Sequence, residues 1–325
     1  MTAATESTQT TAGRGIWIPA YVCGDAWPGA GVRELVLEAQ AGHRLAEASP
    51  GSHVSVRHPN GVTREYSLLG GAEQTNQYRV AIKREAEGRG GSIAFHDALD
   101  IGEEVAVSAP VAGMTLDDTA EHHVFVAGGI GITAIIGLLN GLASASSAEV
   151  HYCVRSAESA PYLDDLRGFG APVHVHDSSV GTRLDVGELI ETCSPTTTLY
   201  FCGPPGLMSD ISTATSSWPA ARVRSETFTP AQDLAAEGGD EPFEVYVNGV
   251  GKTIQVCAEE TMLSALRRSG VHVDSSCEAG QCGTCVLEYT EGDVLHRDSI
   301  LDDDERTEML TPCVSRARGR MAIDL

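Results

Sequence analysis

Short apolar runs, separated by Gly, Pro and Asn, follow one another along residues 15–112. Two of them, at 32–37 and 53–56, are four to six residues long and rich in Val and Leu. Closely spaced short strands with turn residues between them are typical of an antiparallel barrel. We therefore predict a β-barrel over 15–112, preceded by a disordered tail at 1–14.

The pattern changes at residue 113. Short runs at 124–127, 150–154, 173–175 and 199–202, which we predict to be buried strands, alternate with helical segments up to residue 228. This order of strands and helices predicts an α/β domain with a parallel sheet.

One segment of that domain, 124–148, contains no charged residue and offers a membrane span as the competing interpretation. Its glycines, Thr133, Asn140 and several serines interrupt the apolar run. We therefore favour a buried strand, a glycine turn and a helix, and predict no contact with a membrane.

A third unit is predicted over 242–325, after a polar, Ala- and Gly-rich linker at 229–241. Alternating runs at 243–247 and 250–256 flank Asn248-Gly249, which predicts a hairpin. A short helix is expected at 261–269, ended by Gly270. The letters of 248–253 resemble the end of a phosphate-binding loop, but that motif requires Gly where Tyr246 stands.

The formal net charge of −23 argues against nucleic acid as a partner, because neutralising phosphates needs clustered Lys and Arg. The first 13 residues have neither a basic leader nor an apolar core, so we expect a cytoplasmic protein. We also expect a monomer.

Four of the nine cysteines occur late in the chain, at Cys277, Cys282, Cys285 and Cys313. The spacing C-x4-C-x2-C followed by a distant fourth Cys is typical of a plant-type [2Fe–2S] cluster. A zinc site usually pairs two short knuckles, and disulfides are disfavoured in a reducing compartment. The sequence therefore favours an iron–sulfur cluster, which carries one electron at a time and needs an electron source.

Weaker signals upstream suggest that source. Residues 128–134 (GGIGITA) follow a buried strand and open a helix, as a pyrophosphate-binding turn does, although no acidic residue follows about twenty positions on. An ordinary strand–helix turn explains these residues equally well. Residues 202–205 (CGPP) end another strand, and 64–67 (REYS) offer a cation, an aromatic ring and a hydroxyl.

Histidines also gather in the α/β domain, where His174 and His176 alternate on a strand and His122 adjoins His123. No carboxylate or Cys pattern accompanies them. We interpret them as solvated strand histidines rather than metal ligands.

In order, the motifs REYS (64–67), IKR (82–84), GRGGS (88–92), GGIGIT (128–133), CGPPGLM (202–208), ETF (226–228) and the cysteine set resemble the phthalate dioxygenase reductase family. Its members are single-chain FMN reductases with a C-terminal ferredoxin domain. The resemblance implies a β-grasp fold for 242–325 and the cofactors FMN, NADH and [2Fe–2S].

The resemblance also implies roles for particular residues. Arg64, Tyr66 and Ser67 would hold FMN, with Ser67 near flavin N5. The loop Gly90, Gly91 and Ser92 would cradle the FMN phosphate. The dinucleotide would lie on Gly129, Gly131 and Thr133, Cys202 and Gly203 would border the nicotinamide, and Phe228 would cover the flavin. The remaining cofactor-site candidates are Glu65, Ile82, Lys83 and Arg155.

Ser67, Cys202 and Phe228 are the candidate catalytic residues, in the sense that they position the reacting groups. Ala134 stands where the family often has Pro. Arg155 next to Ser156 could grip a 2′-phosphate, so NADPH is the alternative to NADH. The family analogy implies a Rieske non-haem iron oxygenase as electron acceptor, or otherwise a cytochrome P450. A non-enzymatic iron–sulfur carrier or sensor is the alternative of a different class.

Overall fold

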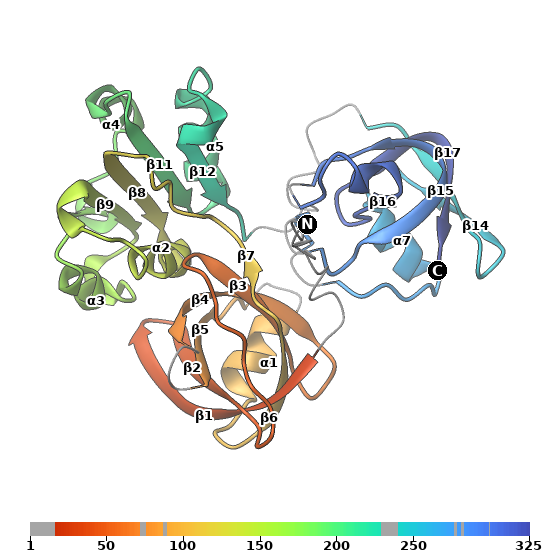
Figure 1. Ribbon diagram of the computed structural model, residues 1–325, viewed down its shortest axis with the longest axis horizontal. Helices are drawn as coiled ribbons and strands as arrows, with labels where there is room; N and C mark the ends of the chain where they lie inside the picture. Colours follow the sequence, from red (N-terminus) through yellow and green to blue (C-terminus); the bar gives the residue numbers. More distant parts are fainter. Residues whose placement is uncertain are drawn as a thin grey trace, which may run out of the picture.

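The computed structural model describes residues 17–71, 76–86, 90–228, 240–275, 278–280, 283–298 and 300–325. Figure 1 shows three units in sequence order, coloured red to orange, yellow to green, and blue.

The first unit is an antiparallel barrel. Its sheet has the order β4-β5-β2-β1-β6-β3-β7, and an additional pairing of β3 with β4 closes it. Its elements are β1 (Trp17–Gly29), β2 (Val32–Ala39), β3 (Ser52–Arg57), β4 (Thr63–Gly71), β5 (Gln77–Lys83), α1 (Gly91–Asp97), β6 (Glu104–Ser108) and β7 (Val111–Ala112). The barrel core includes Leu35, Leu37, Val54 and Val56, which belong to the runs that predicted the strands.

The second unit is a five-stranded parallel sheet of order β10-β9-β8-β11-β12. Its strands are β8 (His122–Gly128), β9 (Ala148–Val154), β10 (Val173–Asp177), β11 (Thr197–Cys202) and β12 (Val223–Glu226). Its α-helices are α2 (Ile132–Leu139), α3 (Leu163–Gly168), α4 (Val186–Thr192) and α5 (Pro205–Ala214). Short 3₁₀ turns lie at Gly129–Gly131, Ala145–Ser147, Ala157–Ser159, Ser178–Val180 and Ala220–Arg222.

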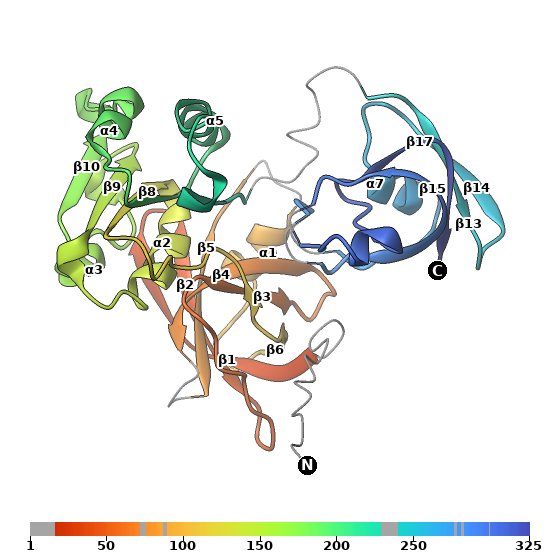
Figure 2. The ribbon, with the colours of Figure 1, turned by 45° about the horizontal axis from the view of Figure 1, so that its top comes forward.

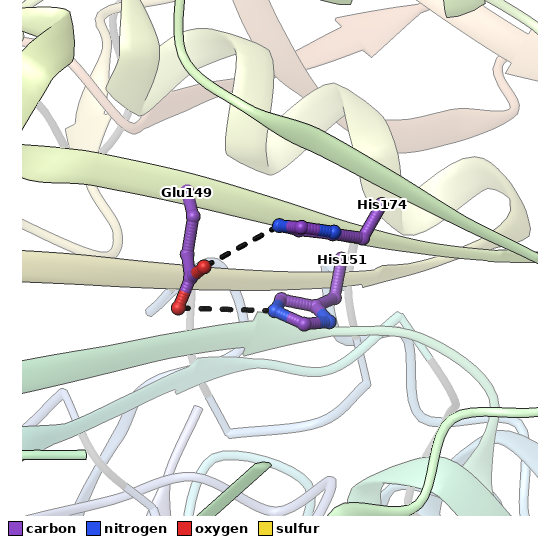
Figure 3. A group of neighbouring side chains, drawn as sticks. All are labelled: Glu149, His151 and His174. Carbon is purple, nitrogen blue, oxygen red and sulfur yellow. Dashed lines mark ion pairs between the residues drawn. The ribbon is translucent and has the colours of Figure 1, made fainter. Parts of the chain in front are cut away.

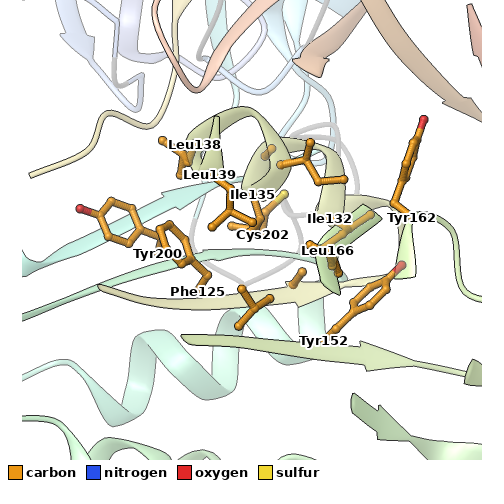
Figure 4. Packing of buried hydrophobic residues seen from close by; sticks show 14 of the residues in the cluster. Phe125, Ile132, Ile135, Leu138, Leu139, Tyr152, Tyr162, Leu166, Tyr200 and Cys202 are labelled. Atoms are coloured by element: carbon orange, nitrogen blue, oxygen red, sulfur yellow. The ribbon is translucent and has the colours of Figure 1, made fainter. Parts of the chain in front are cut away.

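The uncharged segment 124–148 begins within β8, makes the glycine turn and continues as α2, as predicted. All eight residues of α2 are buried, because the helix packs on the sheet and its core cluster also includes Val32, Leu69 and Ala81 of the barrel. Figure 4 shows part of this packing. Among the described residues, no helix is both long and apolar enough to cross a bilayer.

Polar contacts also join the barrel to the α/β unit. Asn140 Nδ2 donates to the Leu69 carbonyl at 2.8 Å, and Tyr162 OH donates to Glu34 Oε2 at 2.8 Å. A Cβ at Gly137 would lie 2.8 Å from the Leu68 carbonyl oxygen, so only glycine allows α2 to approach β4 this closely. The two units therefore hold their facing side chains in a fixed arrangement.

The third unit is a mixed sheet of order β14-β13-β17-β15-β16, in which β13 and β17 run parallel. Its elements are β13 (Phe243–Val247), β14 (Lys252–Val256), α7 (Met262–Arg268), β15 (Leu287–Leu295), a 3₁₀ turn at Glu305–Thr307, β16 (Met309–Leu310) and β17 (Arg316–Asp324). Figure 2 shows α7 lying against this sheet. The predicted fold class, a barrel followed by an α/β domain and a ferredoxin-like domain, is confirmed.

Two local predictions in this unit had different outcomes. The helix predicted at 261–269 forms at Met262–Arg268, with Thr261 as its N-cap, whose side chain accepts from Ser264 N, and Gly270 follows it in the left-handed region. The hairpin exists, but its second strand begins at Lys252 rather than Val250. The turn is longer than predicted because the left-handed residue is Gly251, with φ of 66°, and Val250 is left exposed.

The predicted boundaries at 112, 228 and 241 stay predictions. Most of the predicted linker and the predicted tail 1–14 lie outside the described residues.

Candidate functional site

Arg64 and the glycine loop are brought together on one side of the barrel. Arg64 lies in β4, while Gly90 is the N-cap of α1 and Gly91 its first residue. A Cβ at Gly91 would collide with the Arg64 guanidinium, so the space beside this glycine is occupied by a cation. Free N–H groups at a helix start and a guanidinium together favour an anion such as a phosphate.

The other candidates from the barrel lie in different surroundings. The Ser92 hydroxyl accepts from Glu85 N at 3.1 Å. The Ile82 side chain belongs to the barrel core, and Lys83 forms an exposed ion pair with Glu85 at 2.5 Å. These three side chains have structural partners within the barrel.

Tyr66 packs edge-to-face on Phe95 of α1, with ring centroids 5.6 Å apart. Its hydroxyl is buried and has no hydrogen-bond partner among the described residues, and burial raises the pKa of Tyr66. A buried donor without a partner is costly, so this hydroxyl fits a site whose polar partner is a bound group.

The two glycine motifs of the α/β unit meet at the carboxyl ends of neighbouring strands. Cys202 in β11 is paired with Ala127 in β8. A Cβ at Gly131 would collide with the Cys202 carbonyl, and one at Gly128 would collide with Pro204. The turn after β8 thus packs directly on the turn after β11. Open parallel sheets bind ligands at such carboxyl ends.

The other residues predicted to bind the nucleotide lie in the turn after β8, in α2 and directly after β9. Gly129 has φ of 55° and no atom within 4 Å of an added Cβ. Thr133 is buried, and its hydroxyl donates to the Ile130 carbonyl at 3.0 Å. Arg155 is exposed at the end of β9. The open space at Gly129 leaves its backbone accessible to a ligand.

A carboxyl–hydroxyl pair joins the two units at this edge. Ser67 Oγ of β4 donates to Glu226 Oε1 of β12 at 3.2 Å, and both residues are buried. Glu226 Oε2 has no hydrogen-bond partner among the described residues. Burial raises the pKa of Glu226 to about 7, which the bond from Ser67 opposes. The carboxyl is therefore ready to exchange a proton near neutral pH.

Sequence reasoning assigned no role to Glu226, although it opens the ETF motif. The available signal was a charged residue ending a strand, but only the pairing of β12 with β11 places it opposite Cys202. The Cys202 thiol is fully buried within the α2 core cluster shown in Figure 4. Burial, followed by the nearby Glu226 charge, raises the pKa of Cys202.

His53 adds a second buried titratable group that the sequence did not single out. It is paired with Ser67 across β3 and β4, and its Nε2 lies 3.6 Å from Glu65 Oε1. Burial lowers the pKa of His53 to about 4, so its ring is neutral at pH 7. At pH 7, His53 therefore provides no positive charge that would stabilise the ionised form of Glu226.

Phe228, two residues after Glu226, is 42 % exposed. Large exposed aromatic side chains often mark binding surfaces. The predicted role of Phe228 in covering a flat ring stays a prediction.

In the third unit, Cys285 and Cys313 are buried, and their Sγ atoms lie 3.3 Å apart. A disulfide requires about 2.05 Å, so these are two separate thiols. Two thiolates on one tetrahedral ion, with bonds of about 2.3 Å, would be about 3.8 Å apart. The pair thus fits a shared metal, iron or zinc. Cys277 and Cys282 lie outside the described residues.

A cavity of about 250 Å³ lies elsewhere at the junction of the first two units. None of the predicted cofactor residues lines it. Its lining is Leu69, Arg79, Ile136, Asn140, Tyr162, Asp165, Gly168 and Phe169.

In the comparison with known protein families, a match lies in the third unit. Residues 245–318 match the family of 2Fe-2S iron–sulfur cluster binding domains. This match favours an iron–sulfur cluster over a zinc ion as the metal site of Cys285 and Cys313. The distance between the two Sγ atoms fits either metal.

The whole chain also has relatives. The phthalate 4,5-dioxygenase oxygenase reductase subunit of Pseudomonas putida is 34 % identical over 300 residues, which cover 90 % of this chain and 92 % of that protein. The solved structure of phthalate dioxygenase reductase, described as modular for electron transfer from pyridine nucleotides to [2Fe–2S], matches with a TM-score of 0.69 at 31 % identity. The match covers 95 % of this chain and 98 % of the chain in that structure.

A third match places the same architecture inside a longer protein. The structure of an intact type IV self-sufficient cytochrome P450 monooxygenase has a TM-score of 0.78 at 34 % identity. The match covers 95 % of this chain but only 41 % of that one.

Proposed function

Because this chain belongs to the phthalate dioxygenase reductase family, we propose that it is the reductase component of an oxygenase system, accepting electrons from NADH and delivering them to a separate oxygenase. It is an oxidoreductase that uses a flavin, a nicotinamide nucleotide and a [2Fe–2S] cluster. When bound, the flavin accepts a hydride, which is two electrons, and releases the electrons singly to the cluster.

The observation that carries this proposal is the presence of both halves of such a relay in one chain. The Ser67–Glu226 pair lies at the carboxyl edge of a nucleotide-binding type of sheet, and the Cys285–Cys313 pair lies in a matched iron–sulfur domain. A carrier or sensor without a flavin would leave the Arg64–Gly91 contact without a function.

FMN is the flavin we propose. Arg64 and the N–H groups of Gly90 and Gly91 would bind its phosphate, and the unpartnered Tyr66 hydroxyl would bond to the bound flavin. Phe228, exposed here, would cover the ring. The contact between Gly91 and Arg64 supports this assignment, because a Cβ at position 91 would displace the guanidinium from the proposed phosphate site.

For the nucleotide, we propose that the turns after β8 and β11 form the binding edge. The backbone at Gly129 and Gly131 would contact the dinucleotide, and Cys202 and Gly203 would border the nicotinamide. The Cys202 thiol is buried and largely protonated, so its contribution is to shape this edge rather than to act as a nucleophile. We propose NADH as the preferred nucleotide, with Arg155 exposed near the site.

Ser67 and Glu226 supply the proton chemistry in this proposal. A Glu226 carboxyl with a pKa of about 7 is protonated in a large fraction of molecules at neutral pH. When Glu226 is protonated, its O–H would donate to Ser67 Oγ, the reverse of the 3.2 Å bond from Ser67 to the ionised carboxylate. Ser67 would then release its own hydroxyl proton at the flavin edge as it takes up the proton of Glu226, so that Ser67 stays a hydroxyl and Glu226 becomes the carboxylate. Burial of both groups keeps bulk water from this path.

A Rieske non-haem iron oxygenase is the acceptor we propose, because the relatives include the reductase subunit of a dioxygenase. A cytochrome P450 is the second candidate, since the same architecture occurs within a self-sufficient P450. We further propose that the protein acts as a monomer in the cytoplasm, with no nucleic acid or membrane partner.

The test uses the purified full chain. Heating should release FMN, identified by chromatography, and NADH should reduce cytochrome c through the protein. A Cys285→Ser variant should lose cytochrome c reduction but keep NADH-driven reduction of ferricyanide. A colourless, zinc-loaded protein without flavin would contradict the proposal. Stopped-flow mixing of the reduced protein with a Rieske oxygenase, and separately with a P450, would distinguish the acceptors.

A further inference from the structure

A cluster of histidines around one carboxylate lies on the α/β unit, and the cofactor roles above do not use it. Glu149 and His151 alternate along β9, and His174 lies on the neighbouring β10, paired with His151. Figure 3 shows both rings directed at the Glu149 carboxylate. The sequence favoured solvated histidines here because no carboxylate accompanied His174, but strand pairing supplies one.

The spacing of the donor atoms is that of metal ligands rather than of hydrogen bonds. His174 Nε2 lies 3.4 Å from Glu149 Oε2, and His151 Nε2 lies 3.9 Å from Glu149 Oε1. All three donor atoms lie within 4.8 Å of one another. A tetrahedral ion with bonds of about 2.1 Å separates its ligand atoms by about 3.4 Å. Metal binding would therefore draw the donor atoms together, from within 4.8 Å of one another to about 3.4 Å.

The two ring nitrogens of His151 are placed as they would be in a metal ligand. Its Nε2 is buried, points at the carboxylate and has no hydrogen-bond partner among the described residues. Its Nδ1 lies 3.1 Å from His176 Nε2. In the tautomer in which His151 Nδ1 donates to His176, Nε2 carries no proton and is free to coordinate, and metal-bound histidines commonly donate from their second ring nitrogen.

We propose that Glu149, His151 and His174 bind a borderline divalent transition-metal ion of the Zn²⁺ class, with His176 as the outer partner of His151. Two imidazoles and one carboxylate are a donor set that suits such ions and leaves a fourth position for water. His122 Nε2, 3.8 Å from Glu149 Oε1, lies on the same carboxylate and is the nearest additional ring.

This metal site is separate from the carboxyl ends of the parallel strands, where the predicted nucleotide-binding residues lie. Glu149 is the second residue of β9, whereas the nucleotide candidates follow the carboxyl ends of the strands. The six residue steps from Glu149 to Arg155 span about 20 Å of extended chain. Metal binding is therefore expected to leave electron transfer from NADH unchanged.

The test uses the full chain with flavin bound and its cluster loaded, checked by iron and acid-labile sulfide, so that the cluster cysteines cannot take up zinc. Equilibrium dialysis against Zn²⁺ with elemental analysis should give one zinc per chain, and excess Mg²⁺ should not displace it. His174→Asn and His151→Asn should each weaken zinc binding more than tenfold, and His176→Asn by about tenfold to a hundredfold.

His272→Asn is the matched control, because His272 also lies near a carboxylate, 3.3 Å from Asp274, but forms no group of three ligands within the part of the chain that the structure describes. It should leave zinc binding unchanged. Unchanged NADH-driven ferricyanide reduction in every variant would show that each is folded; His174, half exposed, is the substitution least able to disturb the fold. Zinc retained equally by a His151→Asn/His174→Asn double variant, displacement by Mg²⁺, or an equal loss in His272→Asn would overturn the proposal.

Discussion

Replacing Glu226 by Gln tests whether this buried carboxyl holds a proton near neutral pH. Glu226 accepts one hydrogen bond, from Ser67, and its second oxygen is buried without a partner. A glutamine has nearly the same shape but carries no titrating group. The substitution therefore removes the proton equilibrium while largely preserving the packing.

The magnitude follows from the pKa, which burial raises from 4.5 to about 7. The folded protein keeps a proton on Glu226 between these two values, while the unfolded chain releases it. Stability therefore falls as pH rises through this window, and the loss is complete above pH 7. Between pH 5 and pH 8 the wild-type protein should lose about 2.5 kcal/mol of stability through this one group, since each pKa unit corresponds to about 1.36 kcal/mol.

The assay is denaturant unfolding at pH 5, 6, 7 and 8 of flavin-depleted protein, because a bound flavin would add contacts of its own. Tryptophan fluorescence is selective, since Trp17, Trp27 and Trp218 all lie before the ferredoxin-like unit. The free energy of unfolding of Glu226→Gln, minus that of wild type, should increase by about 2.5 kcal/mol from pH 5 to pH 8.

Glu47→Gln serves as the control, because the Glu47 carboxyl is exposed. Its difference from wild type should stay nearly constant across the same pH range. A constant difference for Glu226→Gln as well would refute the reasoning, since it would mean that burial does not keep this carboxyl protonated.

Three further substitutions, with a fourth as a control, test other parts of the site. Gly91→Ala should lower FMN affinity at least tenfold, measured by flavin fluorescence, because the new Cβ displaces the Arg64 guanidinium; unchanged affinity would remove that contact from the phosphate site. Gly131→Ala should raise KM for NADH and cost about 1–3 kcal/mol of stability, because its Cβ meets a backbone carbonyl. Gly206→Ala, with no atom within 4 Å, should change neither, and equal effects of the two would contradict the packing argument. Cys313→Ser should abolish the visible absorbance of the cluster while leaving flavin reduction by NADH intact; a retained cluster would exclude Cys313 as a ligand.

The sequence alone determined the features that depend on local pattern. Apolar periodicity predicted the barrel, the parallel sheet and α7, because each element must bury one face or both. The cysteine spacing predicted the cluster, because four thiolates must reach one compact group. The second strand of the hairpin was predicted to begin two residues too early, because the turn was placed at Asn248-Gly249 whereas the positive φ belongs to Gly251.

Tertiary structure decided whatever depends on residues distant in the chain. Glu226 became a candidate only when β12 paired with β11 and the barrel brought Ser67 to it from 159 residues away. His174 gained a carboxylate partner only through the pairing of β9 with β10. Burial raises the pKa of Glu226 and lowers that of His53 because water is excluded by atoms from both units, and no local stretch of sequence records that exclusion.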